Sequence, residues 1–447
     1  MTQLHGRTNQ EARGLHRTGR CAAPTAALLI GGAACAGPDV LPPLFLDFGL
    51  STDVFDVTVD PRTLEARFVG LQWQPNPNLP TLWSLAPGGE LVATPMTFVQ
   101  TPGYEYDYLG GARFSDDGTR IVSSCIDSAP CPGQIVVLSE QATWWMTDAP
   151  GAPQGLGFLV DLGPCAYSVG KAIADDGTIA GGNAEAGGIY RWTETEGWIA
   201  LPGASGVPGE TYGSATDISA SGGVITGWTL VPPLFDVFHP ARWDESGCTI
   251  LETPAPVWGL ACAFGVSPDG QILAGSSDGT GLLWVQGAVT PIPPAPDATW
   301  SFAYDVTNEG YVIGDVLTAA EVYSFIWHPS WPAPQSIGAL FADAGGGTIP
   351  TVFEAARLVS AGGSLHVVGH AMIEDEHGQS VTRSVYVRFP APPIAVPGDL
   401  DGDGLVTGSD LGLLLSAYGS ADPSADLDGD GVVDGSDLGI LLAAWSG

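Results

Sequence analysis

One short segment recurs along most of the chain and constrains the fold more than any other feature. A small apolar residue is followed by two polar residues, a glycine and a short strand-like run, as in AIADDGTIAGG from Ala172 and GVSPDGQILAGSS from Gly265. The other copies begin at Asp56, Phe114, Asp217, Asp305 and Leu358. Between them lies a strand-like run centred on an aromatic residue: Trp83, Trp144 with Trp145, Trp192, Trp243, Trp284, Trp327 and Tyr386. The two segments alternate strictly, so a two-part unit occurs seven times.

A unit of about 40–60 residues that contains a few short strands cannot bury both of its faces alone. It must stack on its neighbours, and stacking in a ring gives a β-propeller. We therefore predict a mainly β chain with a propeller of about seven blades over residues 37–390, a small C-terminal helical domain, and essentially no helix before residue 398. The run GQILAG, with small residues at its ends, is expected to be an inner strand beside the crowded axis. The tryptophan strands are expected to pack between blades.

Six further tryptophans fall outside the periodic strand: Trp73, Trp198, Trp228, Trp258, Trp300 and Trp331. Core packing is one role for them, and the alternative is that one of them stacks on a sugar.

Composition excludes several other classes of protein. The chain has 62 glycines, 37 prolines and one lysine, Lys171, which is unlike a helical protein. Hydrophobic residues make up 45% of the chain, so it is not a disordered acidic tail. The 49 acids and 14 bases give a net charge of −35, which repels phosphate backbones and argues against a nucleic-acid partner. Such a charge suits an exported protein or one that binds cations.

The first 36 residues have the organisation of a signal peptide. Residues 1–20 carry four arginines and one acid, and the apolar run CAAPTAALLIGGAACA follows. Ala34 and Ala36 form an A-x-A cleavage site, so we expect cleavage after Ala36 and a secreted or cell-surface location. The alternatives are a disordered extension and, less compatible with Gly32, a lipoprotein acylated at Cys35. Neither this run nor any later stretch is long enough to span a membrane.

After a linker over residues 391–397, two segments match at an offset of 27 residues: DLDGDGLVTGSDLGLLLSAYG from Asp399 and DLDGDGVVDGSDLGILLAAWSG from Asp426. Each opens with D-x-D-x-D-G and has Asp at the twelfth position, which is the ligand spacing of a calcium loop. Carboxylates at loop positions 1, 3, 5 and 12, a carbonyl at position 7 and a water-mediated side chain at position 9 would coordinate each ion. These ligands are Asp399, Asp401, Asp403, Leu405, Thr407 and Asp410 in one loop, and Asp426, Asp428, Asp430, Val432, Asp434 and Asp437 in the other. We predict two calcium ions, and the alternative is a pair of Asp/Gly-rich hairpins with solvated carboxylates.

Each loop runs into one predicted helix whose apolar residues recur at helical spacing. The apolar positions are Leu411, Leu414, Leu415 and Tyr418, and then Leu438, Leu441, Leu442 and Trp445. We expect these two apolar faces to pack on each other.

A duplicated loop followed by one helix resembles a type I dockerin over residues 398–447. The resemblance implies a small all-α calcium-binding module that docks to a cohesin-like or cell-surface protein. It places the partner-binding residues in the helices and at loop positions 10 and 11, which are Gly408, Ser409, Gly435 and Ser436. The repeats over about residues 55–390 resemble the HAF-type extracellular repeat, which implies no particular substrate.

The cysteines and the search for a catalytic group leave the function open. Export favours disulfides, and the short-loop pairings are Cys125–Cys131 and Cys248–Cys262, with Cys165 free. No G-x-S-x-G, H-E-x-x-H or C-x-x-C motif occurs, and no catalytic residue is assigned. His366 and His370 are too far apart along a strand to share a metal, so we interpret them as ordinary strand histidines.

Two functions fit these observations. One is a non-enzymatic propeller that binds a ligand such as a polysaccharide and is anchored through its tail. The other is a polysaccharide-active enzyme, a glycoside hydrolase or lyase, with a catalytic propeller. We favour the first because no catalytic constellation stands out.

Overall fold

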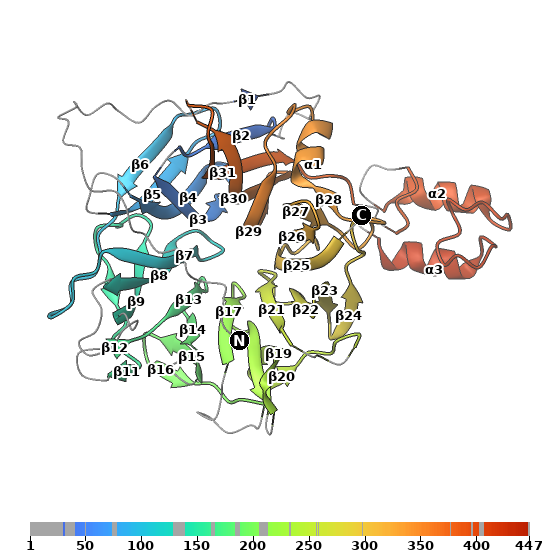
Figure 1. Cartoon of the computed structure of the whole chain (residues 1–447). Coiled ribbons are helices and arrows are strands. Elements are labelled where there is room, and N and C mark those ends of the chain that lie inside the picture. The colour runs from blue at the N-terminus through green and yellow to red at the C-terminus, as the bar shows by residue number, and fades with distance from the viewer. Residues whose placement is uncertain are drawn as a thin grey trace.

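The computed structural model describes residues 30–31, 41–49, 51–73, 78–127, 139–161, 166–183, 188–204, 213–231, 234–255, 257, 259–296, 298–375, 377–394, 397–401 and 406–445. Over these residues seven mainly antiparallel sheets surround one axis, and two helices project beside the ring (Figure 1). The chain is a seven-bladed β-propeller with a small C-terminal helical module, as the seven repeats predicted.

The first three blades begin with strands β3, β7 and β13 at the axis. Blade 1 holds β3 (Thr52–Val59), β4 (Ala66–Gln72), β5 (Leu79–Leu85) and β6 (Leu91–Pro95). Blade 2 holds β7 (Tyr108–Phe114), β8 (Arg120–Asp127) and β9 (Ser139–Met146), with the short β10 (Gln154–Gly155), β11 (Val160–Asp161) and β12 (Ala166–Tyr167) outside them. Blade 3 holds β13 (Gly170–Ile173), β14 (Ile179–Asn183), β15 (Gly188–Thr193) and β16 (Gly197–Ala200).

The other four blades have the same outward strand order. Blade 4 holds β17 (Gly213–Ile218), β18 (Ile225–Val231), β19 (Leu234–Asp244) and β20 (Gly247–Ile250). Blade 5 holds β21 (Ala261–Val266), β22 (Ile272–Ser277), β23 (Thr280–Val285) and β24 (Ala288–Pro291). Blade 6 holds β25 (Ala298–Val306), β26 (Val312–Thr318), β27 (Val322–Trp327) and β28 (Gln335–Ser336). Blade 7 holds β29 (Val352–Ala361), β30 (Ser364–Glu374), β31 (Ser380–Pro390) and β2 (Leu44–Asp47), with β1 (Ile30–Gly31) at its edge.

The ring is closed by a strand from the other end of the chain. β2 pairs antiparallel with β31, from Leu44 opposite Arg388 to Asp47 opposite Val385. An ion pair of 2.6 Å between Arg383 and Asp47 reinforces this pairing. The last blade therefore cannot be completed until both ends of the propeller sequence have met.

The recurring glycine segment forms the hairpin between the first and second strand of each blade. In blade 5 the Ser267 hydroxyl donates to Asp269 Oδ1 at 2.6 Å, and Gly270 has the positive φ of 77° that favours glycine. The run GQILAG lies in and around β22, the second strand, so its placement beside the axis was wrong. The strand before the hairpin is the innermost one, because each blade starts at the axis and proceeds outward (Figure 1).

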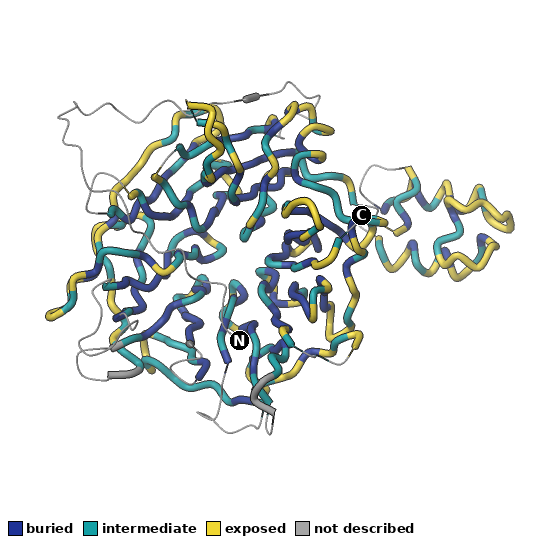
Figure 2. Tube along the Cα trace, viewed as in Figure 1, coloured by how far each residue is buried: buried dark blue, intermediate teal, exposed yellow. Residues whose placement is uncertain are grey.

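The aromatic segment lies on the third strand of each blade and fills the space between blades. Trp145, Trp243, Trp284 and Trp327 are almost completely buried. Buried residues are frequent along the strands of the ring, whereas the helical module is more exposed (Figure 2). The indole N–H groups of these four tryptophans donate to backbone carbonyls, as from Trp284 to Glu252 at 2.7 Å. The expectation that these strands pack between blades is confirmed for these four residues.

The prediction of essentially no helix before residue 398 is confirmed for the described residues, with one short helix as the exception. Helix α1 (Ile337–Asp343) lies in the long connection between blades 6 and 7. Ser336 caps it by accepting from the Ala339 N–H at 3.2 Å, and Leu340 and Phe341 are buried in the core of blade 7. The connection is long enough to form about two helical turns, which cover the edge of that core.

The expected disulfides are absent from the described residues. Cys125, Cys248 and Cys262 are free thiols, while Cys131 and Cys165 lie outside the described residues. Cys248 lies on the outermost strand of blade 4 and Cys262 on the innermost strand of blade 5. The short segment between them runs from the rim to the axis of the propeller. Their proximity in sequence therefore does not bring the two thiols together.

The chain leaves the propeller through a segment that packs on blades 6 and 7. The Trp331 indole donates to the Pro393 carbonyl at 3.4 Å, and the Tyr311 hydroxyl donates to the Pro392 carbonyl. Trp331 therefore anchors the start of the linker. Beyond it lie α2 (Gly408–Ala417) and α3 (Gly435–Ala443). No helix of the described part of the chain is long and apolar enough to cross a membrane.

Part of the expected signal peptide is described by the structure, where β1 pairs antiparallel with β2 at the edge of blade 7. The cleavage site after Ala36 lies outside the described residues.

Candidate functional site

The two acidic loops of the tail bring carboxylates together. One oxygen from each of Asp399, Asp401 and Asp410 lies within 4.8 Å of the others, and so does one from each of Asp426, Asp428 and Asp430. These are the two groups of three or more His, Cys, Asp or Glu side chains among the described residues that could hold a metal ion. Asp403 and Leu405 lie outside the described residues. An all-oxygen donor set of this kind suits a hard cation such as calcium.

The twelfth residue of each loop is buried and closes the loop through the backbone. Asp410 accepts from the N–H groups of Leu400 at 2.7 Å, Asp401 at 3.2 Å and Thr407 at 2.7 Å. Asp437 accepts in the same way from Leu427, Asp428 and Asp434, at 2.6, 3.2 and 2.6 Å. These hydrogen bonds hold the pKa of both carboxyl groups below the usual range.

The ninth residue of each loop begins the following helix. Thr407 caps α2 and Asp434 caps α3, and each forms a capping box with the aspartate three residues later. Gly408, Ser409, Gly435 and Ser436 form the exposed first turns of the two helices. The two loops are therefore closed by the same local bonds, 27 residues apart.

Repulsion between carboxylates is visible in the second loop. A hydrogen bond from the Asp430 N–H lowers the pKa of Asp428. Partial burial and the charges of Asp430, Asp437 and Asp426 raise it more, and the net pKa lies above the usual value. A bound cation would remove this repulsion.

The helices bury less of their apolar surface than the sequence predicted. Leu414 and Leu441 are buried with Val406, Val433 and Ala425 in one small core. In contrast, four equivalent residues of the two repeats face solvent: Leu415, Tyr418, Leu442 and Trp445. The expectation that the complete faces pack on each other was wrong, because Leu415 lies about 100° around α2 from Leu414 and Tyr418 follows the last helical residue, Ala417.

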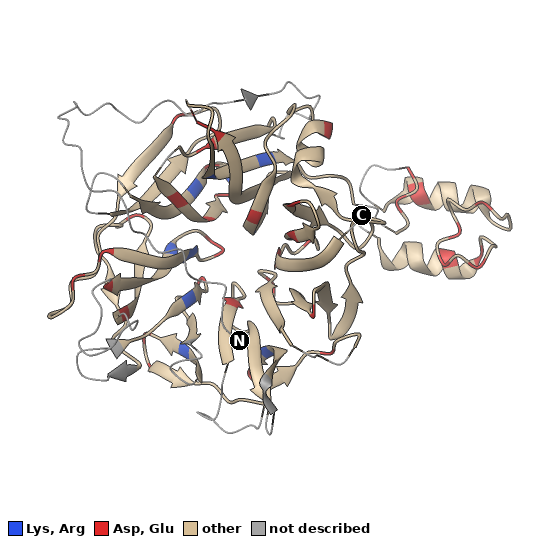
Figure 3. Cartoon of the chain, viewed as in Figure 1, with Lys and Arg blue, Asp and Glu red and all other residues tan. Residues whose placement is uncertain are grey.

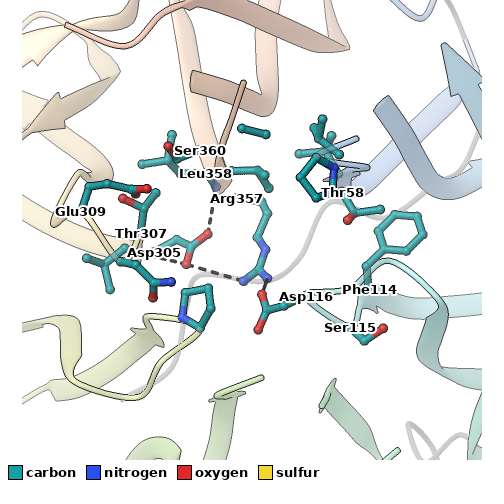
Figure 4. A pocket seen from close by; sticks show the side chains of 18 of the residues that line it. Thr58, Phe114, Ser115, Asp116, Asp305, Thr307, Glu309, Arg357, Leu358 and Ser360 are labelled. Carbon is teal, nitrogen blue, oxygen red and sulfur yellow. Dashed lines mark hydrogen bonds and ion pairs between the residues drawn. The ribbon is translucent and has the colours of Figure 1, made fainter. Parts of the chain in front are cut away.

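A second group of charged residues surrounds the propeller axis. When the first strands are aligned by their hairpins, seven equivalent positions face one another across the axis. They are occupied by Asp56, Arg113, Ala172, Asp217, Gly265, Asp305 and Arg357. The Arg357 guanidinium lies 3.5 Å from Asp305 and 3.2 Å from Asp116 (Figure 4). It also lies 3.4 Å from Asp56 and 3.7 Å from Asp217. One cation thus joins carboxylates from four other blades or their turns.

The same aspartates also tie each blade to the next. Asp56 accepts from the Phe114 N–H at 2.7 Å, and Asp305 accepts from the Leu358 N–H at 2.8 Å. Asp217 accepts from Val266 in the same way at 3.1 Å. Each donor belongs to the first strand of the following blade. This cluster was missed from the sequence, although the repeated D-V/I-T/S of three copies was a signal.

Burial dominates the protonation of this cluster. It raises the pKa of Asp116 to about 7 and that of Asp305 to about 6, although Arg357 lowers both. Burial would lower the pKa of Arg357, but the surrounding carboxylates raise it well above its usual value, so the guanidinium stays charged. The cluster blocks the middle of the channel.

A cavity lies on each side of this block. One, of about 220 Å³, is at the hairpin ends of the first strands and is lined by Asp116, Asp305, Thr307 and Arg357 (Figure 4). The other, of about 370 Å³, is at their opposite ends and is lined by Arg113 and Lys171 among others. The two cavities lie at opposite ends of the same first strands, with the Arg357 cluster between them. We therefore describe them as the two mouths of one channel.

The two strand histidines have structural partners. His366 is buried, with its Nδ1 2.7 Å from the Tyr386 hydroxyl, and burial lowers its pKa to about 3. His370 Nδ1 lies 3.6 Å from Glu354. The two rings therefore have different surroundings, which agrees with their interpretation as ordinary strand histidines.

The tryptophans considered for sugar stacking divide into packed and exposed residues. Trp198 donates to the Leu156 carbonyl at 3.2 Å, and Trp228 packs edge-on against Phe238. Trp73 and Trp300 keep exposed surface. Trp258 lies outside the described residues.

The fold and these sites define a propeller that carries a short helical module with two acidic loops. No protein-family model matches the chain, and no curated protein matches it in sequence.

Some solved structures are similar to the chain at low identity. Prolyl oligopeptidase B from Galerina marginata is 9% identical, with a TM-score of 0.47 over 76% of this chain and 49% of that one. An acylaminoacyl peptidase from Pyrococcus horikoshii is 11% identical, with a TM-score of 0.40 over 74% and 52%. The chain spans about half the length of these two peptidases. A Dos1 propeller is 10% identical, with a TM-score of 0.39 over 77% and 94%.

Proposed function

We propose that the protein is an exported, calcium-binding propeller whose tail docks it to a protein partner. The observation that carries this proposal is the duplicated acidic loop. Two sets of convergent carboxylates, each closed by a buried aspartate, occur 27 residues apart in a module with ten acids and no base. Without a cation these carboxylates repel one another, and calcium supplies the missing positive charge.

The docking surface follows from the same duplication. Tyr418 and Leu442 remain 53% and 51% exposed, although each belongs to an apolar helix with a buried neighbour. Leu415 and Trp445 extend this surface on the two helices. Exposed apolar residues of this kind mark interaction sites. Together with the dockerin resemblance, they support a cohesin-like or cell-surface partner that contacts both helices.

Calcium titration of the full chain by calorimetry tests the metal site. We expect two binding sites, and Asp399→Asn and Asp426→Asn should each remove or weaken one. Asp422→Asn is the matched control, because Asp422 lies in the tail but bonds only locally with Ser424. Undiminished binding of two ions by the Asp399→Asn, Asp426→Asn double variant would refute the assignment.

The docking role is tested with purified cohesin domains on a biosensor. Binding should require calcium and should fall at least tenfold in Leu415→Ser and Trp445→Ser. A tail that is loaded with calcium but binds none of these domains would leave the metal site in place and remove the cohesin-type role.

The second candidate function is a polysaccharide-active enzyme. The observation that favours it is Asp116, whose pKa of about 7 would leave a proton available at neutral pH beside a cavity. However, its neighbour Asp305 is bound to Arg357 and to two backbone N–H groups. Asp305 is therefore held as a structural group, and we favour the binding role. Turnover of a polysaccharide that is lost in Asp116→Asn would reverse this order.

A further inference from the structure

We propose that the mouth of the channel opposite the hairpins binds an anionic saccharide, a short chain of uronic acid residues. This inference rests on the proposed role of the propeller as a binding domain and names its ligand class. It involves neither the calcium loops nor the docking helices.

The first observation is that all seven blades build this mouth. The cavity of about 370 Å³ is lined by residues of every first strand, among them Phe55, Lys171, Thr216, Phe264 and Tyr304. Its volume is in the range of small-molecule sites. Gly111 also lines the cavity, and a Cβ at this position would meet nothing within 4 Å.

The second observation is a ring of strand irregularities at the same level. The pairing of the first with the second strand shifts register in every blade: between Val54 and Asp56, Leu109 and Ala112, Gly170 and Ala172, Ala215 and Asp217, Ala263 and Gly265, Ala303 and Asp305, and Phe353 and Arg357. The residues inside these shifts include Phe55, Lys171, Thr216, Phe264 and Tyr304, which line the cavity. A bulge redirects a side chain out of the regular alternation of the strand. Each blade therefore contributes residues of its register shift to the mouth.

The third observation is the charge of the lining. Arg113 and Lys171 line the cavity and no acid does, in a chain where acids outnumber bases 49 to 14. Lys171 is the one lysine of the sequence. It is half-buried and has no ion pair within 4 Å among the described residues. Figure 3 shows how few basic residues the ring contains. A half-buried ammonium group without a counter-ion favours an anionic ligand.

The fourth observation is a row of aromatic rings that leads to this mouth. Along β25, Trp300 and Phe302 are stacked with centroids 6.1 Å apart, and Phe302 and Tyr304 are stacked at 6.2 Å. Phe264 meets Tyr304 edge-on at 5.6 Å. Trp300, at the outer end, is 42% exposed. Aromatic rings offer flat apolar surfaces to the C–H faces of sugar rings, while the ammonium group would pair with a carboxylate.

This combination selects among ligands. A neutral saccharide would stack on the rings but would leave Lys171 unpaired. A nucleic acid is disfavoured by the net charge of −35. A small carboxylate would pair with Lys171 but would not use the aromatic row.

The test is calorimetric titration of the full chain with trigalacturonic acid, with maltotriose as the neutral trisaccharide, in excess chelator. Chelator removes calcium, so binding there does not depend on a loaded tail. We expect the acidic trimer to bind at least tenfold more tightly than maltotriose, and its affinity to fall with added salt. Lys171→Met should weaken it at least tenfold, Lys171→Arg should retain most of it, and Tyr304→Ala should weaken both ligands.

Arg191→Met is the matched control. Arg191 is a base of the same blade that pairs with Glu196 at 3.5 Å and does not line the cavity, so its loss should leave binding unchanged. An unchanged melting temperature shows that Lys171→Met is folded. If this variant does not fold, the comparison of Lys171→Arg with Tyr304→Ala decides the test.

The outcomes separate this proposal from the docking role. Equal binding of maltotriose, unchanged binding in Lys171→Met, binding of galacturonic acid monomer as tight as that of the trimer, or no saccharide binding would each overturn the inference. None of these results affects calcium-dependent docking. Conversely, loss of docking with intact binding of the acidic trimer would overturn the docking role alone.

Discussion

The propeller and the tail are stabilised in opposite ways. The propeller buries apolar side chains in a series of clusters between blades, and its one axial group of carboxylates has its own cation, Arg357. The tail has one small core around Leu414 and Leu441, and ten acids without a base. The propeller contains the cation that neutralises its axial carboxylates, so it can fold without an added ion. The tail has no such cation, so its folding depends on an ion from solution.

The largest expected effect is that of calcium removal. Each site contributes about 2.7 kcal/mol at a free calcium concentration a hundredfold above its dissociation constant. Two such sites match the whole stability expected of a module of this size. Hydrogen exchange on the full chain in excess chelator should show complete exchange in α2 and α3, with the propeller strands still protected. Retained protection of both helices would contradict the comparison.

Loss of the axial cation is the corresponding experiment on the propeller. Arg357→Leu leaves buried carboxylates, among them Asp56 and Asp305, without their counter-charge, which costs about 3–5 kcal/mol. Denaturant unfolding followed by tryptophan fluorescence measures this loss. The exposed Arg62→Met is the control and should change stability by less than about 0.5 kcal/mol. A loss below about 1 kcal/mol in Arg357→Leu would mean that the cluster is not a stabilising element.

The pH dependence of the propeller sharpens the same point. Because the pKa of Asp116 is raised to about 7 from 3.8, the folded state binds a proton that the unfolded state releases between these values. Its contribution to stability is present below about pH 4 and is lost as the pH rises through 7, with a slope of at most about 1.4 kcal/mol per pH unit. Between pH 5 and 8 the melting temperature should therefore fall more steeply in the wild type than in Asp116→Asn. Parallel curves would show that Asp116 is ionised throughout.

The smallest effect concerns a helix cap of the calcium-loaded tail. Thr407→Ala removes the side chain that accepts from the Ser409 N–H at 3.3 Å, at a cost of about 1 kcal/mol. Thr407→Ser keeps the acceptor and should cost only a few tenths of that. The calcium dependence of exchange in α2 resolves the two variants. An equal loss in both would mean that the methyl group, not the cap, stabilises this helix start.

Local patterns in the sequence predicted much of both regions. The alternation of glycine hairpins and tryptophan strands predicted seven blades, and Trp284 lies in the interior as expected. The spacing of Asp426, Asp428 and Asp430 predicted convergent carboxylates, which the structure brings within 4.8 Å of one another. Such features depend on residues a few positions apart, where backbone geometry leaves few alternatives.

Other expectations failed where the outcome depends on distant segments. The sequence shows that Cys248 and Cys262 are close along the chain, but the blade order places one at the rim and the other at the axis. It shows an apolar helix around Leu415, but not which side of that helix the second repeat covers.

The sequence alone therefore determined the number of blades, the hairpins between strands and the composition of the acidic loops. Only the tertiary structure decided that β2 closes the ring against β31, that Arg357 meets Asp56 and Asp305 at the axis, and that Lys171 lines the far mouth of the channel. The physical reason is that periodicity and turn chemistry act over a few residues. Contacts across the axis exist only after seven units have closed into a ring. The local D-V/I-T/S pattern therefore marks three aspartates but not the side chain that they meet there.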